Sequence, residues 1–340
     1  MEDDIDIRIT KLLIHPIKSC RGISVSESRY DPKGLQFDRQ YLIVDTTSHK
    51  CITAREIPKM ILVETAIESD DTLLRVSFPK ESQIESFTTP LIPNSATLES
   101  WEMISDVEIW LDTGLNAYIA QSSSPTGPSP SSLLSSFLGR DVLLVLKGPK
   151  RRAVVPTSTH PDLDADVRFQ DGFPLLLATT ESLFAVQERI RYSANGAEGW
   201  KVGGITPRWQ TEELAMERFR PNIVLSGSPA AFDEDYWGDV QIGEDDTGGG
   251  VVSVVKRCGR CLLPNVDTNT GIRDNAVPFK VITRFRRVDS EPGSTACFGV
   301  NGVTQASGVF RLGDRLRVLS ILERETLEVN EPPIPVFSAA

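Results

Sequence analysis

The CGRC motif at residues 258–261 is the part of the sequence best suited to chemistry. It follows the apolar run VVSVVK, and Lys256, Arg257 and Arg260 surround its two sulfurs with positive charge. Nearby cations stabilise a thiolate over a thiol, and the thiolate is the form of cysteine that binds metals or attacks substrates. The motif therefore favours one metal-ligating or nucleophilic cysteine.

Three other interpretations of the motif stay open on local sequence alone. A structural zinc site would need two more ligands, but there is no second CxxC and the three histidines are scattered. A thioredoxin-like redox pair would need a helix after the motif, whereas Pro264 and Asn265 make a poor helix. The two cysteines could also be buried as small hydrophobic side chains.

A second candidate site is the segment KSCRG at residues 18–22, just after the first expected strand. Two cations, a hydroxyl donor and a glycine that lets backbone amides approach a ligand make a workable anion cradle. A solvated basic turn explains the segment equally well. Arg39, Arg55 and Arg220 each stand beside an apolar strand, and taken singly each is explained by a salt bridge.

Composition limits the function classes. The 340 residues carry a formal net charge of -11, so phosphate backbones and anionic membranes would repel the chain, and nucleic-acid binding is not expected. Five cysteines without a secretory signal indicate reduced thiols. The acidic N-terminus lacks the features of a signal or transit peptide, and no apolar run is long enough for a transmembrane segment. The expected location is cytoplasmic.

The elements that must position these residues are mostly strands. Alternating or β-branched runs predict strands over residues 7–14, 23–30, 40–44, 60–66, 73–78, 107–111, 142–146, 174–178, 222–225, 251–256, 279–284 and 316–322. Helices are expected over residues 115–121, 131–137, 180–192 and 211–218. Few helices and no regular βαβ alternation favour a mainly β fold with inserted helices, of the α+β class.

Several segments, in order along the chain, resemble the MOSC-domain family, and within it the eukaryotic amidoxime-reducing components, which are pterin-based molybdenum enzymes. The likeness is carried by HPIKSCRGISVSE (15–27), FDRQYLIVD (37–45), TAREIPK (53–59), FRPNIVLSG (219–227), CGRCLLPNVDTNTG (258–271), FGV (298–300) and GVFRLGDRLRV (308–318).

The resemblance implies two β-barrel domains and a linker between them. Residues 1–122 would form the MOSC N-terminal β-barrel domain, and residues 133–325 the MOSC domain that binds the molybdenum cofactor. Residues 123–132 are rich in serine, proline and glycine and are expected to be the linker. Residues 326–340 are expected to be a loose tail.

The resemblance also implies roles for individual residues. Cys261 would ligate the metal of a molybdenum–molybdopterin cofactor and would be the catalytic cysteine. The pterin and its phosphate would contact residues from both halves of the chain, namely Lys18, Ser19, Arg39, Arg220, Asn222, Gly259 and Arg260. Where the family has small hydroxyl residues this chain has Asp171-Gly172-Phe173, so these three positions are left out of the expected site.

The function implied is a molybdenum-dependent oxidoreductase that reduces N-hydroxylated compounds or nitrite. Its electrons would come from a cytochrome b5-type protein and that protein's flavoprotein reductase, because no cysteine-rich ferredoxin segment follows the motif. Members with a mitochondrial outer-membrane location carry an N-terminal anchor that is not seen here. The alternatives are a cofactor carrier or persulfide-transfer module, and a cofactor-free β scaffold.

Overall fold

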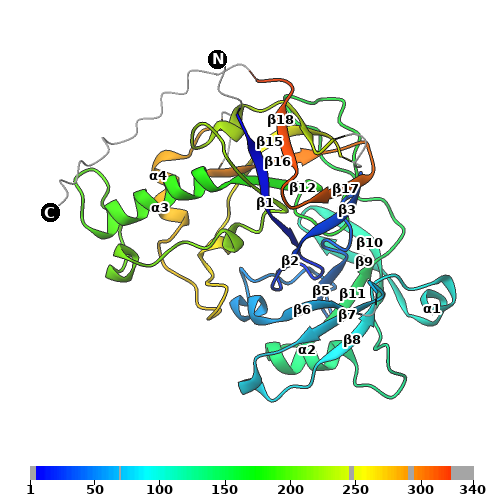
Figure 1. Cartoon of the computed structure of the whole chain (residues 1–340). Coiled ribbons are helices and arrows are strands. Elements are labelled where there is room, and N and C mark those ends of the chain that lie inside the picture. The colour runs from blue at the N-terminus through cyan, green and yellow to red at the C-terminus, as the bar shows by residue number, and fades with distance from the viewer. Residues whose placement is uncertain (1–4, 69, 245–248, 290–294, 323–340) are drawn as a thin grey trace.

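Seven strands close into a β-barrel in the computed structural model, which describes residues 5–68, 70–244, 249–289 and 295–322 (Figure 1). Strand β18 pairs with β1 and closes the ring, and only β12 and β13 run parallel. In barrel order the strands are β1 (Ile7–Ile14), β13 (Ile223–Ser226), β12 (Leu175–Thr179), β16 (Cys297–Val303), β15 (Gly250–Gly259), β14 (Asp239–Ile242) and β18 (Arg315–Val318).

Three smaller sheets and one added strand complete the β-structure of the described residues. Strand β2 (Ile23–Val25) extends β1 outside the ring. A four-stranded sheet joins β5 (Tyr41–Asp45), β11 (Val142–Lys147), β10 (Asp112–Ile119) and β9 (Met103–Ile109). The two three-stranded sheets are β6 (Glu64–Glu68), β7 (Leu73–Ser77) and β8 (Phe87–Pro90), and β17 (Gly308–Arg311), β3 (Glu27–Asp31) and β4 (Gly34–Leu35).

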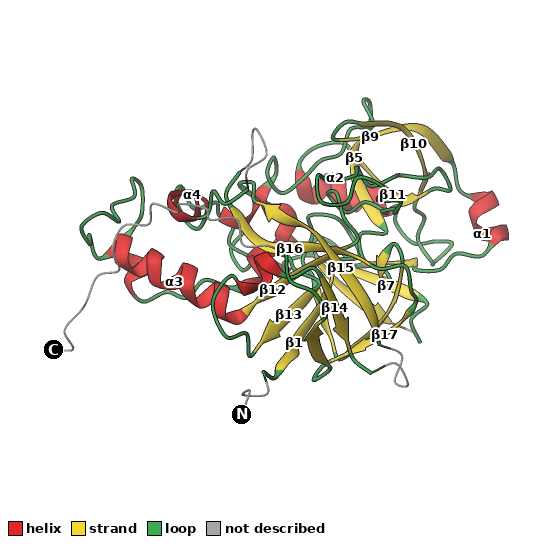
Figure 2. Ribbon diagram, turned by 90° about the horizontal axis from the view of Figure 1, so that it is seen from above, coloured by secondary structure: helices red, strands yellow, loops and turns green. Residues whose placement is uncertain are grey.

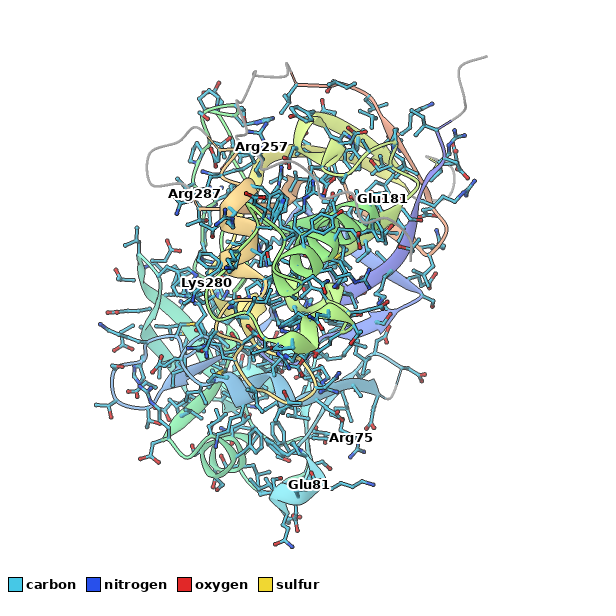
Figure 3. The ribbon with its side chains drawn as sticks, turned by 90° about the vertical axis from the view of Figure 1, so that its left-hand side faces the viewer. Arg75, Glu81, Glu181, Arg257, Lys280 and Arg287 are labelled. Carbon is cyan, nitrogen blue, oxygen red and sulfur yellow. The ribbon has the colours of Figure 1, made fainter. Side chains whose placement is uncertain are left out.

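The described residues form four α-helices, all outside the barrel: α1 (Ser95–Ser100), α2 (Pro130–Leu138), α3 (Thr180–Ala194) and α4 (Phe279–Phe285). Figure 2 shows α3 and α4 on one side of the barrel and the sheet of β5, β9, β10 and β11 on the other. Figure 3 shows α3 and α4 side by side, with Lys280 on α4 and Glu181 at the start of α3. Val186 and Ile190 of α3 and Ile282 of α4 are fully buried in one apolar cluster. That cluster fixes both helices against the barrel, because apolar burial is the main stabilising term.

The expected fold class, mainly β with inserted helices and barrels, is confirmed. Two expected elements are wrong. Residues 115–121 were expected to be helical but belong largely to β10, where Leu115 and Ala117 are buried in alternation and pair with β9. Residues 279–284 were expected to be a strand but form α4, because Val281, Ile282 and Phe285 are buried at helical spacing.

Smaller differences concern element ends. The expected helix over residues 211–218 is only a 3-10 turn at Met216–Phe219. The strand expected over residues 60–66 begins with the 3-10 turn Pro58–Leu62. Residues 245–248 lie outside the described residues, as do residues 323–340, which include the expected loose tail.

The sheets exchange strands along the chain. Strand β1, from the N-terminal region, lies in the barrel between β13 and β18. Strand β11 follows the expected linker in sequence but pairs with β5 and β10 of the preceding region. The division into residues 1–122 and 133–325 stays a prediction, and the sheets join the two ranges into one structure.

Candidate active site

A pocket of about 430 Å³ is lined by all eight residues that were expected at the cofactor site, whereas Cys20, Arg21 and Gly22 of the KSCRG segment do not line it. Its wall includes the segment after β1, the end of β15, and the segments that precede β5, β12 and β13. The expected residues in its wall are Lys18, Ser19, Arg39, Arg220, Asn222, Gly259, Arg260 and Cys261. These residues are spread from Lys18 to Cys261 along the chain. The pocket therefore depends on the tertiary fold, which brings them together.

The backbone is strained at three of these positions. Ser19, Arg39 and Arg220 have φ angles of 70°, 46° and 58°, in the left-handed region that residues other than glycine rarely adopt. Such conformations persist where the surroundings over-determine them, and they cluster at ligand and active sites. The fold thus holds the cationic side chains of Arg39 and Arg220 in fixed directions.

Lys18 is a buried cation, 6% exposed. Its ammonium group donates hydrogen bonds to the Phe169 carbonyl (2.8 Å) and to Asp171 Oδ1 (2.5 Å). Burial lowers the pKa of Lys18, and the charge of Asp171 opposes this shift. Lys18 therefore faces the pocket as a cation held by a single carboxylate.

Arg39 is oriented by the fully buried carboxylate of Asp38. Its Nη1 donates to both oxygens of Asp38, at 2.7 and 2.8 Å, and its Nη2 donates to the Arg220 carbonyl at 3.0 Å. Burial raises the pKa of Asp38, but Arg39 and His15, whose backbone amide donates to Asp38 Oδ1 at 2.8 Å, outweigh burial and bring the pKa down to about 2. Asp38 is therefore ionised and holds Arg39 in place. His15 is buried beside Asp38, with its Nδ1 3.6 Å from Asp38 Oδ1.

Arg220 is buried (7% exposed), and its Nη1 donates to the Cys20 carbonyl at 2.7 Å. Its Nη2 is buried without a hydrogen-bond partner among the described residues. Burial, and then repulsion from Arg39, lowers the pKa of Arg220 to about 9. A buried guanidinium with an unused donor is costly unless an anion pairs with it.

The CGRC motif lies at the end of β15. Arg260 is buried, and its guanidinium donates to Cys258 Sγ (3.0 Å) and to the Phe219 carbonyl (2.7 Å). Its Nε has no partner among the described residues. A Cβ atom at Gly259 would lie 2.7 Å from Thr295 Oγ1, so a side chain there would displace this neighbour.

Cys261 is half-buried and lines the pocket, and its Sγ lies 3.5 Å from the Leu263 amide nitrogen, which donates to it. Cys258 is also half-buried and lines the same pocket. Neither cysteine is fully buried, so the interpretation of the two as buried hydrophobic side chains is wrong. Among the described residues, no group of three or more His, Cys, Asp or Glu side chains could hold a metal.

Asn222 lines the pocket, but its amide is engaged by backbone. Its Nδ2 donates to the Leu13 carbonyl at 3.2 Å, and its Oδ1 accepts a hydrogen bond from the Leu176 amide at 3.1 Å. These bonds tie the ends of β1, β12 and β13 together. Asn222 therefore holds the pocket wall in place, and a direct ligand contact stays a prediction.

Trp110, Asp171 and Arg55 interact at the pocket, and none of the three was among the expected site residues. Trp110 Nε1 donates to Asp171 at 3.1 Å, and the Arg55 guanidinium stacks 4.1 Å from the Trp110 ring centroid. Asp171, Gly172 and Phe173, the positions left out of the expected site, also line the pocket. The position of Arg55 beside a strand was noted, whereas no motif marks Trp110.

The protein thus combines a closed β-barrel with a cationic pocket that is lined by two cysteines. The chain belongs to the MOSC-domain family: residues 6–117 match the MOSC N-terminal beta barrel domain, and residues 164–317 match the MOSC domain.

Among known proteins, the chain is similar to mitochondrial amidoxime-reducing components. It is 27% identical to component 2 of Macaca fascicularis and 26% identical to component 2 of Homo sapiens, in both cases over 90% of this chain and 82% of the relative. It is 26% identical to component 1 of Danio rerio, over 90% of this chain and 83% of the relative. Among the described residues, no helix has the length and apolar character needed to cross a bilayer.

Proposed function

We propose that the pocket binds a molybdenum–molybdopterin cofactor and that the protein is an oxidoreductase for N-hydroxylated compounds or nitrite. Membership of the MOSC family and similarity to proteins named amidoxime-reducing components support a function linked to this cofactor. The sequence identity to these relatives is 24–27%. The residues of the pocket support the more specific assignment of a cofactor.

The observation that carries the proposal is that buried guanidinium N–H groups in the pocket have no hydrogen-bond partner among the described residues. Arg220 Nη2 and Arg260 Nε are buried donors without partners among the described residues, and both belong to the pocket that contains Lys18 and Arg39. A dianionic phosphate on a polar pterin would accept hydrogen bonds from such donors, and guanidinium groups suit it geometrically. The residues present therefore fit the cofactor.

Different residues of the chain would bind different parts of the cofactor. Lys18, Ser19, Arg39, Arg220 and Arg260 would hold the pterin and its phosphate, with Gly259 leaving room for close approach. Cys261 would ligate the metal as a thiolate, the form that nearby cations favour. When bound, the cofactor supplies two-electron and oxygen-atom chemistry, and the protein contributes binding, orientation and electrostatics.

With an N-hydroxylated substrate, the proposed reaction consumes two electrons and two protons for each N–O bond that is cleaved, and it releases one water molecule. With nitrite, one electron and two protons give nitric oxide and one water molecule. The apolar side chains of Trp110, Phe173 and Leu176 line the same pocket and suit a substrate with an apolar body. The electrons would come from a cytochrome b5-type protein and its flavoprotein reductase. The cytoplasmic location stays a prediction, and the relatives named above are called mitochondrial.

Reduction of benzamidoxime by a reduced viologen tests the activity in protein made in a cofactor-competent host. Cys261→Ser is expected to lose at least 100-fold in rate, because the proposed metal ligand is gone. Cys51→Ser is the matched control, since Cys51 is also half-buried but does not line the pocket. Full activity in Cys261→Ser would refute the ligand assignment.

The second candidate is a cofactor carrier or persulfide-transfer module. The observation that favours it is Cys258 Sγ, which is accessible in the pocket and accepts a hydrogen bond from Arg260. That contact would also stabilise a thiolate or a persulfide at Cys258. Persulfide detected on Cys258, in protein that shows no benzamidoxime reduction, would select this candidate over the oxidoreductase.

A further inference from the structure

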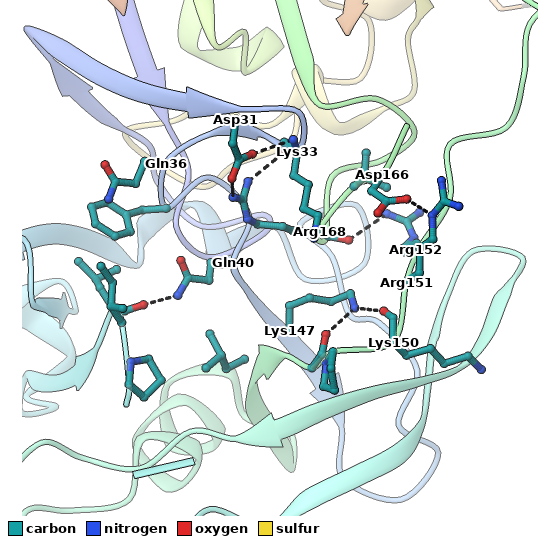
Figure 4. A pocket seen from close by; sticks show the side chains of 18 of the residues that line it. Asp31, Lys33, Gln36, Gln40, Lys147, Lys150, Arg151, Arg152, Asp166 and Arg168 are labelled. Carbon is teal, nitrogen blue, oxygen red and sulfur yellow. Dashed lines mark hydrogen bonds and ion pairs between the residues drawn. The ribbon is translucent and has the colours of Figure 1, made fainter. Parts of the chain in front are cut away.

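A second pocket, of about 620 Å³, shares no lining residue with the candidate active site (Figure 4). It is formed by the turn between β3 and β4, the end of β11 with the loop after it, and the segment between β8 and α1. It is a separate site that the proposed function does not use.

The second pocket is cationic in a chain that is acidic overall. Its lining includes two acids, Asp31 and Asp166, and six cations: Lys33, Lys147, Lys150, Arg151, Arg152 and Arg168. The arginines have carboxylate partners: Arg168 pairs with Asp31 at 2.7 Å, Arg151 pairs with Asp164 and Asp166, and Arg152 pairs with Asp112 at 2.7 Å.

The three lysines lack such partners. Among the described residues, no carboxylate forms an ion pair with Lys33, Lys147 or Lys150. Lys147 Nζ donates only to the carbonyls of Gly148 (2.8 Å) and Lys150, and Lys150 Nζ donates to the Gly114 carbonyl (2.6 Å). The acids of the pocket are thus already engaged by arginines, and the lysine charges are left without an anion.

Lys147 is the most constrained of these lysines, because it is half-buried near the end of β11. Burial, followed by repulsion from Lys33 and Arg152, lowers the pKa of Lys147 to about 8. Figure 4 shows the Lys33 and Lys147 side chains in the same pocket. A negative group between them would relieve their repulsion and raise the pKa of Lys147.

The opposite part of the lining is apolar. Leu91, Ile92, Pro93 and Leu98 belong to the segment between β8 and α1 and to α1 itself. Ile92 is 65% exposed, an unusual position for a large apolar side chain that lines a pocket. Ligand sites commonly combine such an apolar wall with a few convergent polar groups.

We propose that this second pocket binds a small organic anion, a carboxylate or a phosphate monoester, that carries an apolar group. The ammonium groups of Lys33 and Lys147 would hold the anion, and Ile92 and Leu98 would contact the apolar group. Lysine acts as a point charge without the planar fork of arginine, so either head group satisfies the cations. The apolar wall is the reason to expect an organic anion in place of a bare inorganic one.

Ligand-observed NMR titrations of the full chain with benzoate, phenyl phosphate and neutral benzamide test this proposal. At least one of the two anions is expected to bind saturably, and benzamide at least tenfold more weakly. Lys147→Met should weaken the anion at least tenfold, which corresponds to about 1.4 kcal/mol. Lys80→Met is the matched control, since Lys80 is exposed, does not line the pocket and should leave binding unchanged.

Lys33→Met is a second variant whose folding is not in question, because Lys33 is exposed in a turn. It should also weaken the anion, and the tighter of the two anions identifies the preferred head group. Anion binding that survives both substitutions belongs elsewhere and overturns the proposal. Failure of both anions to saturate the wild-type chain, or equal binding of benzamide, overturns it as well. None of these results depends on the cofactor.

Discussion

At the scale of single residues, Arg220 gives the strongest support for an anion-binding role of the active-site pocket. Its guanidinium is buried beside Arg39, and one terminal nitrogen has no partner among the described residues. No carboxylate forms an ion pair with Arg220 there, whereas Asp38 binds Arg39 with both oxygens. Arg220 thus carries an electrostatic penalty in the folded protein that a bound anion would remove.

Arg220→Met is therefore expected to release the cofactor. Methionine retains the length of the apolar stem but provides no donor for a phosphate, and a lost charged hydrogen bond costs about 1.5–3 kcal/mol. The pterin content after extensive dialysis should fall at least tenfold relative to wild type. Arg284→Met is the control, because Arg284 is exposed on α4 and binds only carbonyls of residues 199 and 201. Equal pterin retention in both variants would contradict the role of Arg220.

Residue types with known chemistry could be predicted from the sequence, whereas their neighbours could not. Cysteine, lysine and arginine within short motifs indicated the pocket, and its lining includes all eight expected residues. Asp171 was left out because its type departs from the family, and its contact with Trp110, 61 residues away, forms only in the folded chain. A lone tryptophan at the end of a strand carries no local signal of a ligand site.

At the scale of elements, a buried acid from the 3-10 turn Asp233–Tyr236 packs against the start of α3. Glu234 is fully buried, and its Oε2 accepts hydrogen bonds from Thr179 and Ser182, while Oε1 has no partner among the described residues. Burial, with repulsion from Asp235, raises the pKa of Glu234 from 4.5 to about 7. The folded state therefore retains a proton that the unfolded chain loses.

This raised pKa predicts how stability depends on pH. The contribution of Glu234 is fully present below about pH 4.5 and is lost as the pH rises through about 7, where the folded carboxyl ionises. Glu234→Gln should remove this loss, which amounts to roughly 3 kcal/mol at most. Urea unfolding from pH 5 to pH 8 measures the difference between the variant and wild type. A difference that stays constant over this range would show that Glu234 does not titrate there.

The packing of α3 on the barrel gives a second prediction at this scale. Ile190 is fully buried in the cluster shared with α4, whereas Phe184 on the same helix is 62% exposed. Ile190→Ala should lower the free energy of unfolding by about 2–5 kcal/mol, since it removes buried methyl groups and leaves a cavity. Phe184→Ala should change it by about 0.5 kcal/mol or less. Urea denaturation compares them, and similar losses would contradict the assigned buried face.

Elements were predicted well where burial and propensity agree, as in β1, β11 and α3. They were predicted wrongly where tertiary contacts override propensity. Leu115 and Ala117 favour a helix locally, but pairing with β9 places them in a strand. The β-branched and aromatic residues of α4 favour a strand, yet burial against α3 selects the helix.

At the scale of the whole molecule, the barrel and the pocket both join distant parts of the chain. Strand β1 closes the barrel against β13 and β18, and the loop after β1 supplies Lys18 to a pocket completed by Arg220 and Cys261. Local patterns could not predict this closure, because pairing between distant strands leaves no mark in a short segment. The same closure concentrates cations in a chain whose net charge is -11.

The central claim is a bond between the Cys261 thiolate and molybdenum in this pocket. X-ray absorption at the molybdenum edge tests it most directly, with wild type and Cys261→Ser made in a cofactor-competent host. We expect molybdenum in the wild-type protein to have one more sulfur neighbour than in Cys261→Ser. Identical sulfur shells in the two proteins, or wild-type protein without molybdenum, would contradict it.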